Sequence, residues 1–501
     1  MLPDDQYNRA LIAQVHPAGW TNPKPARRYN LVVIGAGTAG LVSAVGAASL
    51  GATVAIIERS LLGGDCLNVG CVPSKALLSA ARIAAAQRDG AAFGVSGAGE
   101  VRVDFPAVME RMRRLRAGLA HHDSAARLQG LGIDVFFGDA KFVAADAIAV
   151  GPDTLRFAKC VIATGARAAV PPIPGLDATA FVTNETVFAL TALPRRLIVI
   201  GGGPIGCEMA QAFRRFGGEV TIIGRDRRLL PADDADASAI IERTFLRAGI
   251  TLALGATVVR VGPGVDPSTR VVVYDTGGTQ HEVVGDELLI ATGRAPNVEG
   301  LDLAVAGISM DAGGVVVDDH LRTANRRVYA AGDICSRYKF THAADAMARI
   351  ALQNALFFGR KKASALTMPW ATYTDPEVAH VGLRAAEAMH RGSEVVTLNV
   401  PMTEIERAVL ESETEGFARV HVQRRTGKLL GATMVASHAG EMIGELSLAI
   451  TAGLRVGMLS RTIHPYPTQS EAWKKLGDAW NRTRLTPRVR SMFERLMRWR
   501  R

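Results

Sequence analysis

The chain has 501 residues, of which 48% are hydrophobic and 21% charged, a composition typical of a folded protein with several domains. Residues 482–501 hold eight arginines and one acid, Glu494, so this segment alone carries +7 of the net charge of +10. The rest is close to neutral, which argues against a nucleic-acid binder, and five cysteines are too few for a disulfide scaffold.

Residues 1–28 contain several prolines but lack the basic patch and apolar stretch of a signal peptide. We therefore expect an N-terminal extension on a cytoplasmic protein. From Leu31 to Ile57 there is no charged residue, and this run is long enough to cross a bilayer. It breaks at Gly35 after four apolar residues, however, and so predicts a strand, a helix and a second strand buried in a parallel sheet.

An internal repeat with an offset of 166 residues organises the chain. LVVIGAGTAGLVSAVGAASLGATVAIIER begins at Leu31, and LIVIGGGPIGCEMAQAFRRFGGEVTIIGR begins at Leu197. Each copy reads strand, glycine turn, helix, strand, which is the unit that binds a dinucleotide, because its glycines permit a tight turn and its helix N-terminus faces the pyrophosphate. The aligned glycines are Gly35, Gly37, Gly40 and Gly51 in the first copy and Gly201, Gly203, Gly206 and Gly217 in the second.

The two copies differ where the second strand ends. The first has Glu58, a carboxylate placed to accept hydrogen bonds from a ribose diol. The second has Gly224 followed by Arg225, with Arg227 and Arg228 nearby, and arginines suit a 2′-phosphate. We therefore expect FAD in the first copy and NADPH, rather than NADH, in the second. The alternative is that these arginines are only solvated surface.

Shorter motifs mark the passages between these regions. VIATG ends at Gly165 and LIATG ends at Gly293, and each reads as a buried strand followed by a turn. The strand VYAAGD delivers Asp333 at its carboxyl end, where ligands of open α/β sheets bind. Asp333 is thus either a ligand of a flavin ribityl hydroxyl or an ordinary turn residue.

The predicted fold class is α/β, with two Rossmann-like dinucleotide-binding domains, for FAD and NAD(P)H, and a C-terminal α+β domain. The predicted boundaries are 1–28 for the extension, 29–165 and 285–350 for a discontinuous FAD domain, 166–284 for the NAD(P)H domain, 368–481 for the C-terminal domain and 482–501 for a basic amphipathic tail.

A pair of cysteines follows the first repeat in GGDCLNVGCVPSK, residues 63–75. Cys66 and Cys71 are close enough in sequence for a disulfide with slight distortion of the chain. Lys75 and a helix N-terminus would favour a thiolate at one of them. No second cysteine or histidine pair stands nearby, so we predict no metal site. We expect the remaining cysteines, Cys160, Cys207 and Cys335, to be core thiols.

Taken together, these motifs resemble the class I pyridine nucleotide–disulfide oxidoreductases, the group of glutathione reductase, dihydrolipoamide dehydrogenase and mercuric reductase. The resemblance covers about residues 29–481. It implies a homodimer joined by the late domain. It also implies that Cys66 engages the substrate, that Cys71 rests against the flavin, and that Lys75 lies beside the flavin's reactive nitrogen and pairs with Glu208 near the nicotinamide.

The last motif of the family separates its members. The glutathione and lipoamide enzymes place a general acid–base histidine five residues before a glutamate. Here Tyr466 stands five residues before Glu471, and a phenol is a poor base at pH 7. His464 is a further candidate, which we expect to be structural. The His-Pro-Tyr sequence resembles the corresponding motif of mercuric reductase. This resemblance implies that Tyr466 and Glu471 of one subunit complete the active site of the other subunit.

The predicted activity is therefore reduction of Hg(II), a soft ion suited to thiolates, with electrons from NADPH through FAD and the cysteine pair. Two features depart from mercuric reductase: no cysteine follows Cys335, and residues 1–28 contain none. A disulfide reductase of the dihydrolipoamide dehydrogenase type is the alternative.

The basic tail allows a third hypothesis. Its apolar residues recur near helical spacing with arginines between them. In one interpretation the tail is a basic amphipathic helix that lies on anionic lipid, and the protein is a flavoprotein that donates electrons to a protein or quinone at the membrane surface. In the other interpretation the tail is a helix docked on its own dimer. The apolar residues are Val489, Met492, Phe493, Leu496 and Trp499.

Overall fold

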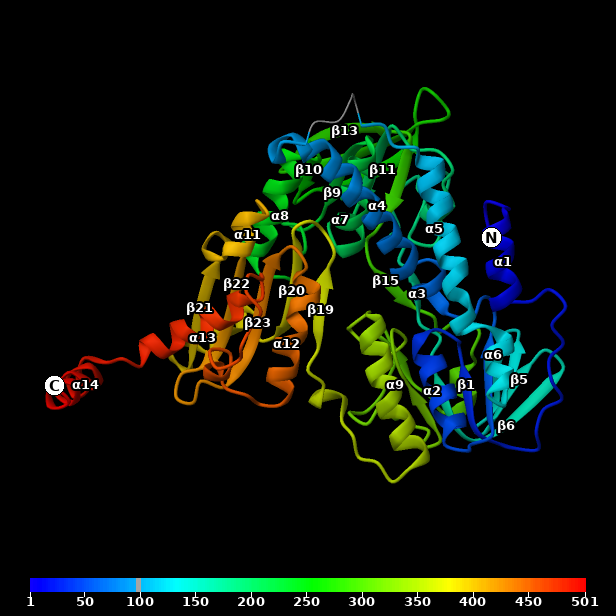
Figure 1. The fold of residues 1–501 in the computed structure, drawn as a ribbon. Helices are drawn as coiled ribbons and strands as arrows, with labels where there is room; N and C mark the ends of the chain where they lie inside the picture. The colour runs from blue at the N-terminus through cyan, green and yellow to red at the C-terminus, as the bar shows by residue number, and fades with distance from the viewer. Residues whose placement is uncertain (96–100) are drawn as a thin grey trace. The chain divides into compact units, whose positions relative to one another are not determined.

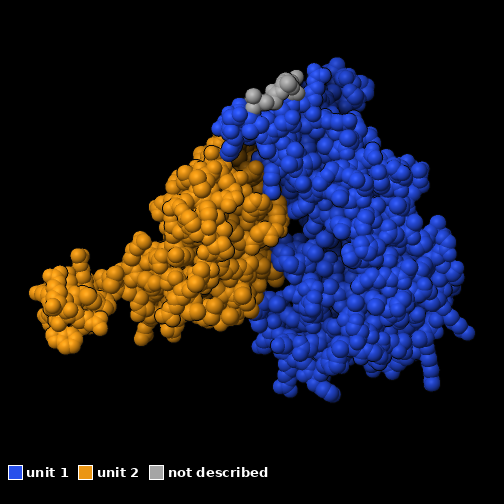
Figure 2. Space-filling model, in the orientation of Figure 1, with its two compact units in different colours: residues 1–225, 249–366 blue, residues 226–248, 367–501 orange. Residues whose placement is uncertain are grey.

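The computed structural model describes residues 1–95 and 101–501, which form two compact units. Unit 1 comprises residues 1–225 and 249–366, and unit 2 comprises residues 226–248 and 367–501 (Figure 2). Both nucleotide-binding repeats therefore lie in unit 1, whereas the late region lies in unit 2 together with the short segment 226–248.

Unit 1 contains a seven-stranded sheet built on the first repeat (Figure 1). The strands β1, β2, β3, β6 and β18 pair in parallel, and β4 and β5 add an antiparallel edge. In sheet order they are β3 (Ile133–Phe137), β2 (Val54–Glu58), β1 (Tyr29–Ile34), β6 (Asp153–Ile162), β5 (Ala147–Val150) and β4 (Ala140–Ala144), with β18 (Val328–Ala330) beside β6.

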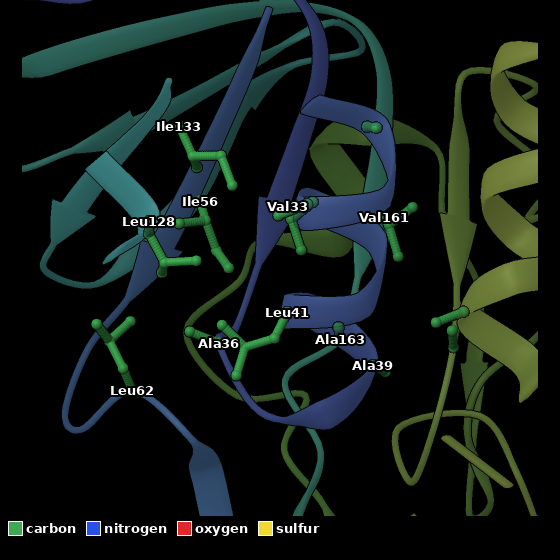
Figure 3. Close-up of a cluster of buried hydrophobic side chains, with 14 of the residues drawn as sticks. Val33, Ala36, Ala39, Leu41, Ile56, Leu62, Leu128, Ile133, Val161 and Ala163 are labelled. Atoms are coloured by element: carbon green, nitrogen blue, oxygen red, sulfur yellow. The ribbon is translucent and has the colours of Figure 1, made fainter. Parts of the chain in front are cut away.

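The first strand is buried on both faces, as its uninterrupted apolar sequence predicts. Leu31 and Val33 point into one core cluster, and Val32 and Ile34 point into another on the opposite face. Figure 3 shows the first cluster between α2 (Thr38–Ser49) and the sheet. On that side α2 also packs against α9 (Thr341–Leu356). The charge-free run after Leu31 is thus a strand, a helix and a strand, as predicted.

The second repeat forms its own parallel sheet of four strands, in the order β10-β9-β8-β14. Its helix α7 connects β8 to β9, and a three-stranded antiparallel sheet lies in the same part of the chain. The elements are β8 (Arg196–Ile200), α7 (Pro204–Phe216), β9 (Glu219–Gly224), β10 (Thr251–Leu254), β14 (Glu287–Ile290), β11 (Thr257–Pro263), β12 (Arg270–Thr276) and β13 (Thr279–Gly285).

Both glycine turns are as tight as the repeat predicts. Gly35 and Gly201 have φ values of 95° and 124°, which only glycine adopts without strain. A Cβ added at Gly40 would lie 1.8 Å from the carbonyl oxygen of Gly35, and one at Gly206 would lie 2.1 Å from that of Gly201. The helix of each repeat therefore approaches its strand so closely that no side chain fits between them.

Helices from three stretches of unit 1 pack side by side. Within the extension, α1 (Gln6–Val15) packs on α5 (Phe105–Leu119), and α5 packs on α4 (Cys71–Asp89). The helical run Gly64–Phe93, which contains α3 (Gly64–Asn68) and α4, is long and apolar enough to cross a membrane by length and composition. Within unit 1, α4 packs on α5 and α7 and buries Leu77, and 39% of the apolar window of this run is buried.

Unit 2 is a five-stranded antiparallel sheet with helices on it. The helices α12 and α13 bury Leu446, Trp473 and Leu476 against this sheet. In sheet order the strands are β19 (Pro369–Thr372), β20 (Glu377–Gly382), β23 (Leu429–Ala436), β22 (Phe417–Gln423) and β21 (Val395–Pro401), and the helices are α8 (Ala235–Arg247), α12 (Ala439–Thr451), α13 (Glu471–Thr483) and α14 (Pro487–Trp499).

Segment 226–248 belongs to unit 2 because a buried carboxylate binds it to the sheet. Asp234, at the start of α8, accepts a hydrogen bond of 2.9 Å from Thr433 and lies 3.3 Å from the guanidinium of Arg419. Asp233 beside it accepts one of 2.7 Å from the indole of Trp370. Such charged and polar contacts between distant segments have no periodic sequence pattern and were not predicted.

The tight second turn gives a test of the fold. We expect Gly206→Ala to destabilise this region by about 1–3 kcal/mol, because the added methyl group meets a backbone oxygen. Gly203→Ala is the control, since a Cβ there would meet nothing within 4 Å. The measurement is the apparent Tm of each variant without nucleotide. Equal values for the two variants would contradict the turn geometry.

Candidate active site

The cysteine motif lies directly against the first glycine turn. Gly63 and Gly64 have φ values of 90° and 56°, and a Cβ at Gly64 would lie 2.6 Å from the Cα of Gly37. After this contact, Cys66 lies in α3, and Cys71 is the first residue of α4. The fold therefore brings both cysteines next to the turn that the sequence assigns to a dinucleotide.

The two cysteines are free thiols with different electrostatic environments. The pKa of Cys71 is lowered to about 6, chiefly by the hydrogen bond with Cys66 and in addition by Thr341, whose hydroxyl is 3.3 Å away, and by Lys75. The hydrogen bond to Cys71 and burial raise the pKa of Cys66 well above its ordinary value. At neutral pH the reduced pair is therefore a thiolate at Cys71 beside a neutral thiol at Cys66.

A cavity of about 630 Å³ opens beside Cys71. Cys71 itself is exposed, whereas Cys66 is half-buried. One wall is α4 and the other is α5, which contributes two arginines and two leucines. Small molecules can therefore reach the thiolate. The lining residues include Val72, Lys75, Ser79, Arg111, Arg114, Leu115 and Leu119.

An ion pair joins the redox helix to the second repeat. Lys75 Nζ lies 2.8 Å from Glu208 Oε2. Lys75 is one turn after Cys71 on α4, and Glu208 is in the second turn of α7, where it is buried. The two residues that the sequence resemblance implies as partners thus lie in contact.

The residues expected around FAD lie at the edge of the first sheet. Glu58, at the end of β2, accepts hydrogen bonds of 2.8 Å from the backbone N–H groups of Ala36 and Ser60, and burial raises its pKa. Asp333 follows β18, and burial likewise raises its pKa. Both carboxylates thus stand at the carboxyl ends of parallel strands, where a dinucleotide binds.

The helix termini of both repeats fit pyrophosphate groups. The helices α2 and α7 begin after Gly37 and Gly203, and within the described residues neither start has a side-chain cap. Their first N–H groups therefore face space in which an anion can bind. Gly165 and Gly293, with φ values of 68° and 137°, follow β6 and β14, and a Cβ at either would meet nothing within 4 Å.

The expected determinant of nucleotide preference lies at the end of β9. Arg225 directly follows this strand and is exposed. Among the described residues it makes no hydrogen bond or ion pair, so its guanidinium is available to an anion. Arg228, by contrast, donates to the carbonyl of Pro231 at 2.9 Å.

Tyr466, Glu471 and His464 lie in unit 2, not in the unit that holds the thiols. The Tyr466 side chain is exposed, and its hydroxyl donates a short hydrogen bond to Glu406, which raises the pKa of Tyr466. His464 Nε2 is 3.1 Å from Glu445 Oε1. Glu471 begins α13, and its buried Oε2 has no hydrogen-bond partner among the described residues.

Arg294 is a site residue that the sequence did not predict. Its Nε lies 3.2 Å from Asp333 Oδ2, and its Nη2 makes a short ion pair with Asp65, next to Cys66. It thus connects the carboxylate after β18 to the redox motif. An arginine directly after the glycine of a turn reads as surface, so the sequence offered no signal for this role.

Arg116 is a second unpredicted residue, and it connects the N-terminal extension to the redox loop. It is almost fully buried on α5, and burial lowers its pKa to about 10. Its guanidinium donates hydrogen bonds of 2.6 Å to the carbonyl of Asn68, between the two cysteines, and to Asn8 of α1. The extension therefore supports the loop that holds the thiols.

A thiol pair placed between two dinucleotide-binding turns defines a flavin-dependent disulfide oxidoreductase. Comparison with protein families agrees: the pyridine nucleotide-disulphide oxidoreductase model matches residues 29–348, and the dimerisation domain model of the same family matches residues 368–476. The chain belongs to the pyridine nucleotide–disulfide oxidoreductases. It is an FAD-dependent enzyme that uses a pyridine nucleotide, and its dimerisation domain supports a homodimer.

Relatives within the family differ in their acceptors. The chain is 36% identical over 448 residues to the mercuric reductase of Lysinibacillus sphaericus, covering 89% of this chain and 81% of that protein. It is 34% identical over 458 residues to the dihydrolipoyl dehydrogenase of Mycobacterium bovis, covering 89% and 96%. It also resembles a Cu(II) complex of the HOCl-induced flavoprotein disulfide reductase RclA from Escherichia coli, with a TM-score of 0.80, 29% identity and coverage of 91% and 100%.

The low pKa of Cys71 gives a test of the site. In the reduced protein we expect iodoacetamide to label Cys71 with a midpoint near pH 6, because the thiolate forms as the pH rises through the pKa. Lys75→Met should move the midpoint upward, since it removes a cation that lowers the pKa of Cys71 and keeps the Glu208 carboxylate, which raises it. Peptide mass spectrometry measures the labelling.

Lys141→Met is the matched control, because Lys141 pairs with Asp302 away from the thiols. Its midpoint should equal that of the unmodified chain. A midpoint near 9 in the unmodified chain, or none of the expected shift in Lys75→Met, would contradict the assigned environment.

Proposed function

We propose that this protein is a cytoplasmic, NADPH-dependent reductase of Hg(II) in which Cys66 and Cys71 bind the metal ion. The observation that carries the proposal is the exposed Cys71 with a pKa of about 6 beside the second thiol of Cys66. Two sulfur ligands, one already ionised at neutral pH, suit a soft metal ion. The mercuric reductase relatives and the Cu(II) complex of RclA add support.

In this proposal the chain's own residues bind and orient the metal ion. The thiolate of Cys71 binds it first, and Cys66 completes a two-sulfur site as its thiol proton passes to water when the second bond to the metal ion forms. When bound, FAD would supply the two electrons, taken from NADPH, that reduce Hg(II) to Hg(0). Glu58, Asp333 and the first glycine turn would hold FAD, and Lys75 would lie beside its reactive ring.

The roles of the remaining candidates follow from the same proposal. Tyr466 and Glu471 of the second subunit would complete the metal site, with the phenol as an oxygen ligand. His464 would be structural, since it contacts Glu445 and the carbonyl of Thr462.

A dihydrolipoamide dehydrogenase-type reductase is the second candidate, and the dihydrolipoyl dehydrogenase relatives favour it. Such an enzyme needs a group near the outer thiol that exchanges protons at neutral pH. Tyr466 is less suited to this than an ordinary tyrosine, because its hydrogen bond to Glu406 raises its pKa. A third candidate is a flavoprotein that donates electrons to a quinone or protein at a membrane surface.

A panel of acceptors tests these alternatives. NADPH oxidation by the purified flavoprotein is followed with Hg(II) in excess thiol, oxidised glutathione, lipoamide and a quinone. We expect Hg(II)-dependent turnover, and we expect Cys66→Ala and Cys71→Ala each to abolish it because a single thiolate cannot form the two-sulfur site. Cys160→Ala is the control, a buried thiol far from the motif in sequence. Rapid lipoamide reduction without Hg(II) turnover would refute the proposal.

The preference for NADPH is a separate prediction. Arg225→Ala should lower kcat/KM for NADPH by about tenfold to a hundredfold, the usual value of a charged hydrogen bond, and leave that for NADH unchanged. Arg195→Ala is the control, because Arg195 is exposed before the amino end of β8, away from the edge where ligands bind. If kcat/KM fell equally for NADPH and NADH, Arg225 would not recognise the 2′-phosphate and would be only a solvated surface residue.

A further inference from the structure

The last helix of the chain is amphipathic, and none of its residues is buried. Thr486 caps it, since its hydroxyl accepts a hydrogen bond from the N–H of Val489, and Pro487 follows in the first turn. The side chains of Trp499 and Met492 are 82% and 59% exposed. In Figure 1 this helix, α14, stands clear of the sheet of unit 2.

The residues of α14 divide cleanly between two faces. At about 100° per residue, its apolar side chains fall on one half of the helix and its basic side chains on the other. The apolar half is Val489, Met492, Phe493, Leu496, Met497 and Trp499, and the basic half is Arg488, Arg490, Arg495 and Arg498.

The preceding helix shows what a covered helix looks like in the same unit. The apolar face of α13 buries Trp473, Leu476 and Trp480 in the core of unit 2. The apolar face of α14, by contrast, contributes no buried residue to the part of the chain that the structure describes. Large apolar side chains exposed together on one helix face are typical of an interaction surface.

We propose that α14 binds the surface of an anionic lipid bilayer, with its apolar half in the headgroup boundary and its arginines on the phosphates. Eight arginines and one glutamate in residues 482–501 give the segment a charge of +7, whereas the remainder of the chain is close to neutral. A basic helix with Trp, Phe and Leu on its apolar face has the chemistry of an interfacial helix.

The same charge disfavours a second copy of α14 as the partner. Two such helices face to face would bring eight arginines together with two glutamates, and like charges repel. The proposal does not depend on the acceptor of the thiol pair, so it can hold whether or not Hg(II) is the substrate.

The test is sedimentation of the full-length holoprotein with lipid vesicles. We expect binding to vesicles of equal parts phosphatidylglycerol and phosphatidylcholine, and none to phosphatidylcholine alone. Binding should weaken as salt rises from about 0.15 M to about 1 M, where the Debye length falls from about 8 Å to about 3 Å. Phe493→Glu with Leu496→Glu should weaken it by about tenfold or more and leave NADPH oxidation unchanged.

Two measurements keep the outcome decisive. Val409→Glu with Leu410→Glu is the matched control, because these exposed apolar residues lie on α11 (Glu406–Leu410) rather than on α14, and it should bind vesicles normally. Size-exclusion chromatography of each variant reports the dimer. The proposal would be overturned if the unmodified protein did not bind vesicles, or if both double variants bound them equally. It would also be overturned if only the α14 variant lost the dimer, because α14 would then contact the partner subunit.

Discussion

The contact between Lys75 and Glu208 is the constraint on which the redox site depends. It joins α4, which begins with Cys71, to α7 of the second repeat, and Glu208 is buried, so its charge requires a partner. The pair also acts on the thiol: Lys75 lowers the pKa of Cys71, and Glu208 raises it. One contact therefore positions the reactive helix against the second nucleotide helix and balances the charge that the thiolate meets.

The parts of this arrangement that depend on local sequence could be predicted. The repeat identified both strand–turn–helix units, because a glycine such as Gly40 or Gly206 is needed wherever a helix approaches a strand too closely for a side chain. Glu58 was placed correctly at the end of β2, because strand alternation and the glycine spacing fix that position. The pairing of Lys75 with Glu208 could be predicted only from the family resemblance, because 133 residues separate them in the sequence.

Contacts between distant segments could not be predicted in the same way. Arg116 reads as a solvated residue of an amphipathic helix, yet it is buried between the extension and the redox loop. Arg294 reads as part of a turn, yet it pairs with both Asp65 and Asp333. In both cases the guanidinium is bound by carbonyl or carboxylate oxygens from elements far apart in sequence instead of by water. A local sequence pattern cannot predict such contacts.

The proton balance of the reaction connects these features to the proposed acceptor. Reduction of a disulfide needs two electrons and two protons, so a site that performs it efficiently holds a group that donates protons near pH 7. Reduction of Hg(II) to Hg(0) needs two electrons and no proton. At the position of the usual histidine this chain has Tyr466, whose hydrogen bond to Glu406 raises its pKa further. Such a phenol is of little use for proton transfer at neutral pH. In the proposed role of an oxygen ligand beside two sulfurs, it would move no proton during the reduction, which is the reason for proposing the metal ion as the acceptor.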